Sequence, residues 1–374
     1  MLKKPKLKKF LTIFPISETT WGLRGGSDEL WRLKLRDEEA KHALALLAYL
    51  NGKYEVDQII NEMAVKGVDA EEVNVLLQRM DEASLIEEAD GFGLSETEEQ
   101  AFQSQITFFS RYTSEGGAKY QSRLRATRVG IIGDGYLGRS LRRQLQEAGF
   151  GEILLLSADP EPVRASLNGH GSANGDTPQT TRVLQLDRDS VWGEKDEALP
   201  SLIFVAQEAE DPQLLEAVDH FSKEKKVPWM LVRAMESQVG WVGPLFIPDE
   251  TACYQSLEAR LRSNLEYFPE HQVFTHYLKE QRGPAASCGG LHAFFELLSA
   301  IGVVEAIKFL ANVTVPSLAG RFLTINLSNW DVEIHEVLRV PPLGLQVTEP
   351  RLFAWKEMPH FEANEEGSIY SRRS

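Results

Sequence analysis

The sequence predicts an α/β protein with a doubly wound, mostly parallel sheet, preceded by a small winged-helix domain. The first observation is the segment Arg128 to Asp159, RVGIIGDGYLGRSLRRQLQEAGFGEILLLSAD, which combines an apolar run, a glycine turn, a helix-period segment and a second apolar run. The second is the alternation that follows it, in which short apolar runs at 182–186, 202–206 and 229–232 flank a helical pattern over 213–222. Such alternation is typical of βαβ units that share one parallel sheet.

The third observation concerns the N-terminal part, where strand-like runs come before helical ones. Three runs between Phe10 and Arg36 are separated by turn-forming residues, and the run DELWRLKLR mixes leucines with charged residues as an exposed edge strand does. Three helix-period segments follow. Asp37 caps the first, the second carries apolar residues from Val56 to Met63, and Asp69 caps the third. With a short strand near Ser84, this pattern predicts a winged-helix domain over residues 1–94.

The rest of the chain completes the predicted domain organisation. Residues 95–126 are predicted to form a connecting helix, residues 127–346 the large α/β domain, and residues 347–374 a polar tail. The apolar helix predicted over 290–312 carries three charged residues and is expected to be buried or to face a second copy of the chain. Strands are also predicted at 321–327 and 332–340.

Length, charge and cysteine content narrow the class of protein. The 374 residues suggest two or three domains, and the net charge of −15 disfavours a general binder of nucleic acid or anionic membranes. A lysine cluster at the N-terminus is expected to be a solvated arm (Lys3, Lys4, Lys6, Lys8 and Lys9). No apolar run reaches the roughly 18 residues that a membrane span requires, and two cysteines do not make a disulfide framework. The chain is therefore expected to be cytoplasmic.

A winged helix suggests either a DNA-binding or a peptide-binding surface. The third helix carries Glu71, Glu72, Asp81 and Glu82 against Arg79 alone, and these acidic groups would repel phosphates. An extended peptide that adds to the edge strand uses main-chain hydrogen bonds and needs no basic face. Peptide binding is therefore preferred, with DNA binding and simple packing against a neighbouring domain as alternatives. The predicted peptide-binding residues are Leu30, Trp31, Arg32, Leu33, Lys34 and Leu35 on the strand and Glu72, Val75, Leu76 and Arg79 on the third helix.

The glycine turn is the second candidate site. Gly133 permits the tight turn, Gly135 allows the backbone to approach a phosphate, and Gly138 allows the helix to pack on the strand. Amides at the start of the following helix favour anions. Because the same turn is also kept for packing alone, it is good evidence for the fold and weak evidence for a ligand.

Two segments together carry a resemblance to a known family. The glycine-turn segment and GPLFIPDETACYQSLEARLRSN (residues 243–264) resemble the E1-like superfamily of ThiF/MoeB type, whose large domain is Rossmann-like. The closer similarity is to the ocin-ThiF-like "F" partner proteins of azoline-forming peptide biosynthesis. The N-terminal part resembles their PqqD-like recognition element. This resemblance implies a protein that grips the leader of a ribosomally made precursor peptide, presents it to a YcaO-type cyclodehydratase, and forms a homodimer.

Departures from the family pattern bear on ATP. Adenylating members carry D-x-D after the second strand, where this chain has Ser157, Ala158 and Asp159. They then carry S-N-L-N-R-Q, where residues 165–170 read ASLNGH, and a downstream lysine that is absent between His170 and Arg182. A triphosphate needs cations to offset its charge. We therefore expect no ATP use and no catalytic residue, and interpret Gly133, Gly135, Gly138 and Asp159 as a vestigial nucleotide turn. The alternative is an ATP-dependent enzyme that adenylates a peptide carboxylate or amide.

Zinc is the other cofactor that the resemblance raises. The family often holds a structural zinc ion with two C-x-x-C pairs. Here the first pair reads Cys253-Tyr254-Gln255-Ser256, and the region of the second, near residues 341–345, contains no cysteine. One thiol cannot hold such an ion, so no metal is expected.

Overall fold

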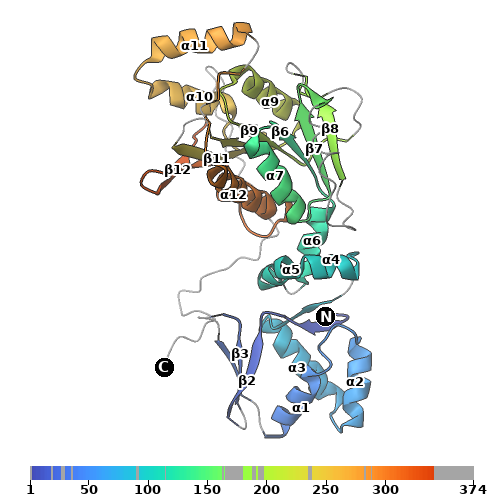
Figure 1. Ribbon diagram of the computed structural model, residues 1–374. Helices are drawn as coiled ribbons and strands as arrows, with labels where there is room; N and C mark the ends of the chain where they lie inside the picture. Colours follow the sequence, from blue (N-terminus) through green and yellow to red (C-terminus); the bar gives the residue numbers. More distant parts are fainter. Residues whose placement is uncertain are drawn as a thin grey trace. The chain divides into compact units, whose positions relative to one another are not determined.

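The chain divides into two compact units, the first up to Ser122 and the second from Arg123. The computed structural model (Figure 1) describes residues 2–17, 20–26, 30–34, 37–89, 92–113, 115–161, 164, 180–187, 191–192, 198–234, 238–281, 284–287 and 289–340. The predicted polar tail (347–374), Cys288 and most of the polar segment between the second and third strands of the α/β domain lie outside the described residues.

The first unit has the strands and helices that the sequence predicts between residues 10 and 88. A three-stranded antiparallel sheet is formed by β2 (Thr12–Ser17), β3 (Thr20–Arg24) and β4 (Leu30–Lys34), in that order. The three helices are α1 (Asp37–Leu47), α2 (Val56–Val65) and α3 (Ala70–Glu82). The apolar faces of the three helices and the sheet bury one core, which includes Leu23, Leu46, Ile59 and Leu76. The assignment of this unit as a winged helix stays a prediction.

The N-terminal lysine cluster differs from its prediction. β1 (Pro5–Leu7) pairs antiparallel with β5 (Ile86–Glu88), and Lys6 forms an ion pair of 3.2 Å with Glu87. Lys8 is only 2% exposed, and burial lowers the pKa of its ammonium group while the charge of Glu87 offsets part of this effect. The expectation of a solvated arm is therefore wrong at Lys6 and Lys8. The lysine-rich segment contains the short strand β1, which the sequence analysis did not predict.

The predicted connecting helix over 95–126 is also wrong as one element. The structure has α4 (Glu96–Ala101), α5 (Gln103–Phe109), a 3₁₀ turn η1 (Ser110–Tyr112) and α6 (Gly117–Arg125). Ser95 caps α4 through a reciprocal pair of bonds with Glu98. The expected break at the two glycines is present, because Gly116 has φ +106° and a Cβ at Gly117 would overlap the Ile106 carbonyl oxygen.

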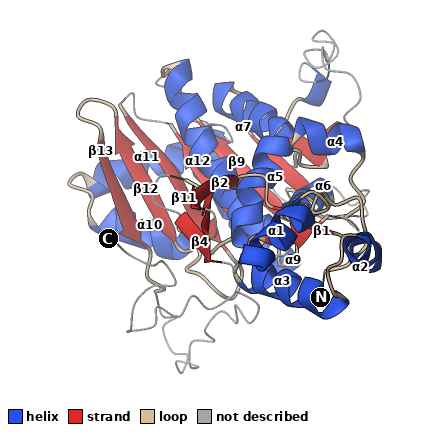
Figure 2. Ribbon diagram, turned by 90° about the horizontal axis from the view of Figure 1, so that it is seen from below, coloured by secondary structure: helices blue, strands red, loops and turns tan. Residues whose placement is uncertain are grey.

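The second unit contains the mostly parallel sheet that the sequence predicts. Its eight strands follow the order β13-β12-β11-β10-β9-β6-β7-β8, and the strands from β10 to β8 pair in parallel. Those parallel strands are β6 (Arg128–Ile132), β7 (Glu152–Ser157), β8 (Thr180–Gln185), β9 (Leu202–Gln207) and β10 (Trp229–Arg233). An antiparallel extension comprises β11 (Val239–Phe246), β12 (Arg321–Asn326) and β13 (Asp331–Glu336), and Figure 2 shows β13 at its outer edge. The sequence did not predict β11.

Helices cover both faces of this sheet. On one face lie α7 (Tyr136–Glu147) and α12 (His292–Ala311), which pack against each other (Figure 1). On the other, α9 (Pro212–Lys225) and α10 (Tyr254–Ser263) enclose a core with Ile203, Val205 and Trp229. α11 (Phe268–Gln281) follows α10 and contacts α9. The arrangement is doubly wound, as predicted, and it brings the carboxyl ends of the parallel strands to one edge. No helix in the described ranges has the length and apolar character needed to cross a bilayer.

Candidate functional site

The predicted peptide-binding strand is an edge strand of its small sheet. Within the described residues β4 pairs only with β3, in a register that sets Leu23 opposite Trp31 and Gly22 opposite Arg32. In the described part of the chain, no strand pairs with the main-chain N–H and C=O groups on the other side of β4. An extended peptide can pair with such an edge as an additional strand, a binding mode called strand addition. Leu33 and Lys34 belong to β4, whereas Leu35 lies outside the described residues.

Side chains of β4 divide between the core and the surface. Trp31 is partly buried and packs against the core of the first unit, while Leu30 and Arg32 are exposed. Across from Arg32, Gly22 lies under the Phe14 ring, where a Cβ would come within 2.5 Å of the ring carbon Cζ. β4 thus packs on the core through Trp31, and its opposite face carries the exposed side chains of Leu30 and Arg32.

Helix α3 supplies the predicted second wall. Val75 is 41% exposed and Arg79 is exposed, whereas Leu76 belongs to the core, which it shares with Trp31 of β4. Glu72 Oε1 lies 2.6 Å from Nδ1 of His42 in α1, a partner that the sequence analysis missed. The side chains that β4 and α3 bury in their shared core cannot contact a peptide, so a peptide would have to contact their exposed side chains. Of the four predicted residues on α3, Val75 and Arg79, one helical turn apart, are the exposed ones.

The glycine turn has the strand–turn–helix geometry that the spacing predicts. Gly133, at φ +110°, follows β6, and a Cβ there would overlap the Ala206 carbonyl oxygen of β9. Gly135 is the N-cap of α7, and a Cβ at Gly138 would overlap the Gly133 carbonyl oxygen. Gly133 and Gly138 are therefore required by the packing of the turn on itself and on β9.

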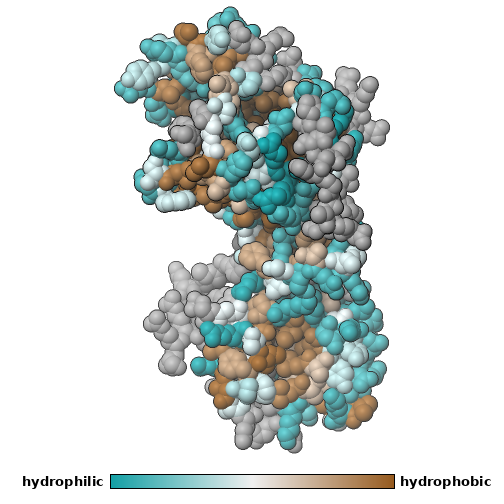
Figure 3. Space-filling view, viewed as in Figure 1, coloured by the Kyte–Doolittle hydropathy of each residue, from teal (hydrophilic) through white to brown (hydrophobic). Residues whose placement is uncertain are grey.

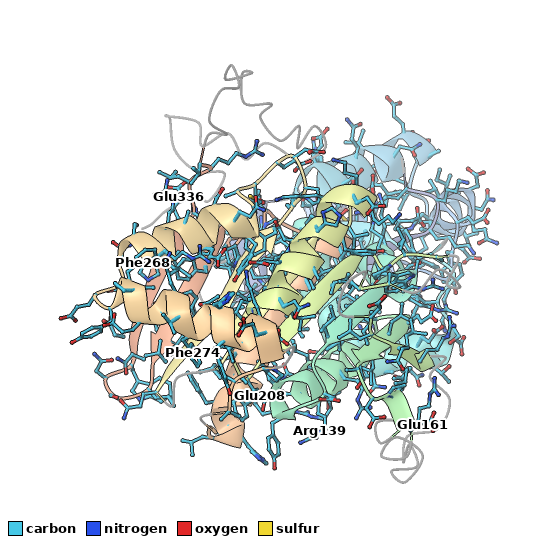
Figure 4. The ribbon with its side chains drawn as sticks, turned by 90° about the horizontal axis from the view of Figure 1, so that it is seen from above. Arg139, Glu161, Glu208, Phe268, Phe274 and Glu336 are labelled. Carbon is cyan, nitrogen blue, oxygen red and sulfur yellow. The ribbon has the colours of Figure 1, made fainter. Side chains whose placement is uncertain are left out.

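A carboxylate lies directly against this turn. Glu208, which is labelled in Figure 4, follows the last residue of β9. Its Oε1 accepts a hydrogen bond of 2.7 Å from the Leu137 amide in the first turn of α7. A Cβ at Gly135 would lie 2.6 Å from the Glu208 carboxyl carbon and 2.8 Å from Oε2. The sequence analysis missed Glu208. The available signal was an acidic residue immediately after a buried strand, at the edge where ligands of such sheets bind.

The end of β7 and the glycine turn itself each contribute a further acidic group. Ser157 Oγ donates to the Asp134 carboxylate at 2.9 Å, and the amide of Asp159 donates to Ser157 Oγ at 3.2 Å. Asp134 and Asp159 are both exposed. Arg139 of α7 lies over the Tyr136 ring at 4.5 Å and donates to the Asp134 carbonyl oxygen at 3.3 Å. The predicted turn residues and Asp159 thus lie at one edge of the sheet, in predominantly acidic surroundings.

The segment from Cys253 to Ser256, in which no zinc site was expected, lies at the start of α10. Cys253 is the N-cap residue, and its Sγ lies 3.5 Å from Ser256 Oγ, where the second cysteine of a C-x-x-C pair would stand. In the described part of the chain, no three His, Cys, Asp or Glu side chains come together in a way that could hold a metal ion.

Comparison with known proteins identifies the fold. No protein-family model and no curated protein sequence matches this chain. Among solved structures, the heterocyclase TruD superposes on 90% of the chain with a TM-score of 0.63 and 20% identity. A heterocyclase in complex with substrate and cofactor does so with values of 0.62 and 19%. The chain spans only 42% and 38% of those two chains, but it spans 98% of the microcin C7 biosynthetic enzyme MccB in complex with N-formylated MccA (TM-score 0.57, 14% identity). The chain therefore has the fold of MccB and of the matching part of TruD.

Proposed function

We propose that this chain is a leader-peptide-binding partner protein that presents a precursor peptide to a separate YcaO-type cyclodehydratase, which forms the thiazoline or oxazoline rings. The observation that carries the proposal is the edge of β4 that has no strand partner in the described residues, on a strand that shares its core with α3. The chain also has the fold of the heterocyclase TruD. Solved relatives of this fold include a heterocyclase with substrate and cofactor. We assign an extended peptide to the β4 edge, because such an edge binds a peptide by strand addition.

Strand addition explains how one surface binds a long peptide tightly. Main-chain hydrogen bonds along β4 supply affinity that depends little on sequence, and pockets for alternate side chains supply specificity. Leu30 and Val75 offer apolar contacts, and Arg32 and Arg79 offer cationic ones to acidic residues of a leader. In this proposal, a second protein that docks on the α/β unit carries out the ring-forming step.

Leader binding without ATP is the first test of this proposal. A fluorescein-labelled leader peptide, taken from a precursor encoded beside this chain, should bind the full protein with a Kd in the micromolar range or below, measured by fluorescence polarisation. Addition of MgATP should leave that Kd unchanged, because no step in the capture of an extended strand uses a nucleotide. Polarisation that stays at the free-peptide value up to 100 µM protein (about −5.5 kcal/mol) would remove the proposal.

The alternative function, adenylation of a peptide by the chain itself, makes the opposite prediction. Its support is the strand–turn–helix unit around Gly133, which the fold shares with MccB. Exchange of labelled pyrophosphate into ATP, dependent on the precursor peptide, is the signature of that chemistry. We expect no exchange from the isolated protein.

We also propose a homodimer, formed by the face that α12 shares with the antiparallel end of the sheet. A Cβ at Gly240 of β11 would come within 2.5 Å of Leu298 in α12, so this side of the sheet faces the helix. Gly240 pairs with Ile325 and Ile325 pairs with Val332, which places Val332 on that same face. Two residues further along β13, Ile334 shares it.

The apolar residues on this face continue from the strand onto the helix. Val332 and Ile334 on β13 and Val304 on α12 are each about half exposed. Leu297, Ile301 and Val304 repeat at the spacing of one helical stripe on the side of α12 away from α7. Figure 3 shows hydrophobic side chains over α12 and the adjoining strands. An apolar surface of this kind, contributed twice around a twofold axis, suits a homodimer interface.

Substitution of Ile334 tests the dimer. Ile334→Lys places a charge at a position that is 55% exposed in the monomer and would be desolvated in the dimer, so the protein should sediment as a monomer at 10 µM. Val273→Lys is the matched control, because Val273 on α11 is an apolar residue that is 71% exposed and lies away from this face. Analytical ultracentrifugation should show a dimer for wild type and for Val273→Lys. A monomeric wild-type protein would contradict the dimer.

A further inference from the structure

The start of α7 has the features of an anion site. The helix has 12 residues, follows a glycine turn, and begins at the carboxyl edge of the parallel strands. Its first amides have no carbonyl partner within the helix, and the helix dipole adds about half a positive charge there. In sheets of this kind such an end usually receives a phosphate group. What lies against it in this chain is the carboxylate of Glu208.

The fit of Glu208 to the turn is close. One oxygen accepts from the Leu137 amide at 2.7 Å, and the other lies 2.8 Å from the place of a Cβ on Gly135. The carboxylate fits here because Gly135 has no Cβ. In a nucleotide-binding turn this glycine lets a phosphate approach the backbone, whereas in this chain it lets the Glu208 side chain do so. The chain thus keeps the glycine pattern, but the Glu208 carboxylate occupies the space beside the turn.

The segment that carries Glu208 is tied down on both sides. The Gln207 carbonyl oxygen accepts from the Ala234 amide at 2.9 Å, and the Glu210 carbonyl oxygen accepts from the Ala285 amide at 2.8 Å. Asp211 then caps α9 by accepting from the Leu214 amide at 3.2 Å. Because the backbone is fixed before and after Glu208, moving the carboxylate away from α7 would require its side chain to rotate out alone.

We infer that Glu208 is a built-in anion that occupies the phosphate position of the glycine turn and closes this chain to nucleotides. A triphosphate could enter only by displacing a charge-assisted hydrogen bond, and it would then meet the carboxylates of Glu208, Asp134 and Asp159. The residues present therefore do not fit ATP. The inference deepens the proposed function by explaining why capture of a peptide needs no nucleotide, and it depends on that function in no other way.

The test removes the carboxylate and measures binding of phosphates. Isothermal titration of the full-length protein with sodium tripolyphosphate, and separately with MgATP, should give no heat of binding for wild type up to 1 mM ligand. Glu208→Ala should bind tripolyphosphate at least tenfold more tightly than that limit, because the Leu137 amide and the positive helix end become available. Glu208→Gln keeps the side-chain volume and an oxygen acceptor but loses the charge, and it should show a smaller gain.

Controls separate this result from unfolding and from a general change in charge. Glu210→Ala removes an equal charge two residues away and should leave tripolyphosphate binding as weak as in wild type. Circular dichroism and the Kd for the leader peptide should be unchanged in all three variants, so loss of leader binding would count against the proposed function and not against the role of Glu208. MgATP binding by wild type that Glu208→Ala weakens would make Glu208 a ligand of the nucleotide's metal and overturn the inference. Folded variants at Glu208 with no gain for either ligand would also overturn it.

Discussion

Val75→Asp is expected to weaken binding of the leader peptide at least tenfold while leaving the fold intact. Val75 is 41% exposed on α3, beside the predicted path of a peptide along β4. A peptide that covers this position would remove water from the new carboxylate, and an unpaired charge buried at an interface costs well over 1 kcal/mol. Because the side chain is open to solvent in the free protein, the free energy of unfolding should change by less than about 1 kcal/mol.

A second valine of the same unit provides the control. Val65 is the last residue of α2 and is 87% exposed, so Val65→Asp makes the same chemical change on a helix that carries none of the predicted peptide-binding residues. Fluorescence polarisation should give the wild-type Kd for Val65→Asp and a Kd at least ten times larger for Val75→Asp. Equal affinities of the two variants for the leader peptide would show that the peptide does not bind next to Val75 on α3. A thermal midpoint that falls for Val75→Asp alone would show that the loss came from unfolding.

The elements that the sequence predicted best are those whose pattern is local. The βαβ unit around Gly133 and the three helices of the first unit follow from apolar spacing and capping residues, and the structure has them close to the expected bounds. β1 was missed because Lys4, Lys6 and Lys8 resemble a solvated arm, whereas the strand that β1 pairs with, β5, lies some eighty residues away. β11 pairs with the preceding strand β10, and it was missed because Gly240, Gly243 and Pro244 interrupt its strand pattern.

The candidate site shows the same division. An edge strand next to a helix could be predicted from the alternating pattern of Leu30 to Leu35, and the structure places 30–34 at a sheet edge. The contacts of Glu72 with His42 and of Glu208 with the Leu137 amide could not be predicted, because each joins residues that only the tertiary fold brings together. The glycine turn was correctly predicted as a structural element, but only the position of Glu208 indicates what fills it.

Gly138→Ala is expected to destabilise the α/β unit by about 3 kcal/mol or more, although alanine is the better helix former by roughly 1 kcal/mol. The reason is that the added Cβ would lie 2.8 Å from the Gly133 carbonyl carbon and would overlap its oxygen, which are backbone atoms of a tight turn with no rotamer to change. The turn would have to open, and with it the contact of α7 with β6 and β9. Urea unfolding, followed by amide hydrogen exchange in α7 and β6, measures the change in stability of this unit.

Gly302→Ala makes the same chemical change where the neighbours can yield. Gly302 is buried in α12, and a Cβ there would lie 3.3 Å from a ring carbon of Phe204 and 3.4 Å from a methyl group of Val232, both in side chains. A small shift of those groups would offset much of the gain in helix propensity, so stability should stay within about 1 kcal/mol of wild type. A large loss for Gly138→Ala in this protein, which we propose does not bind nucleotide, would mean that packing alone preserves the glycine turn. If Gly138→Ala proved as stable as Gly302→Ala, packing would not explain the turn, and a ligand at Gly133 would have to.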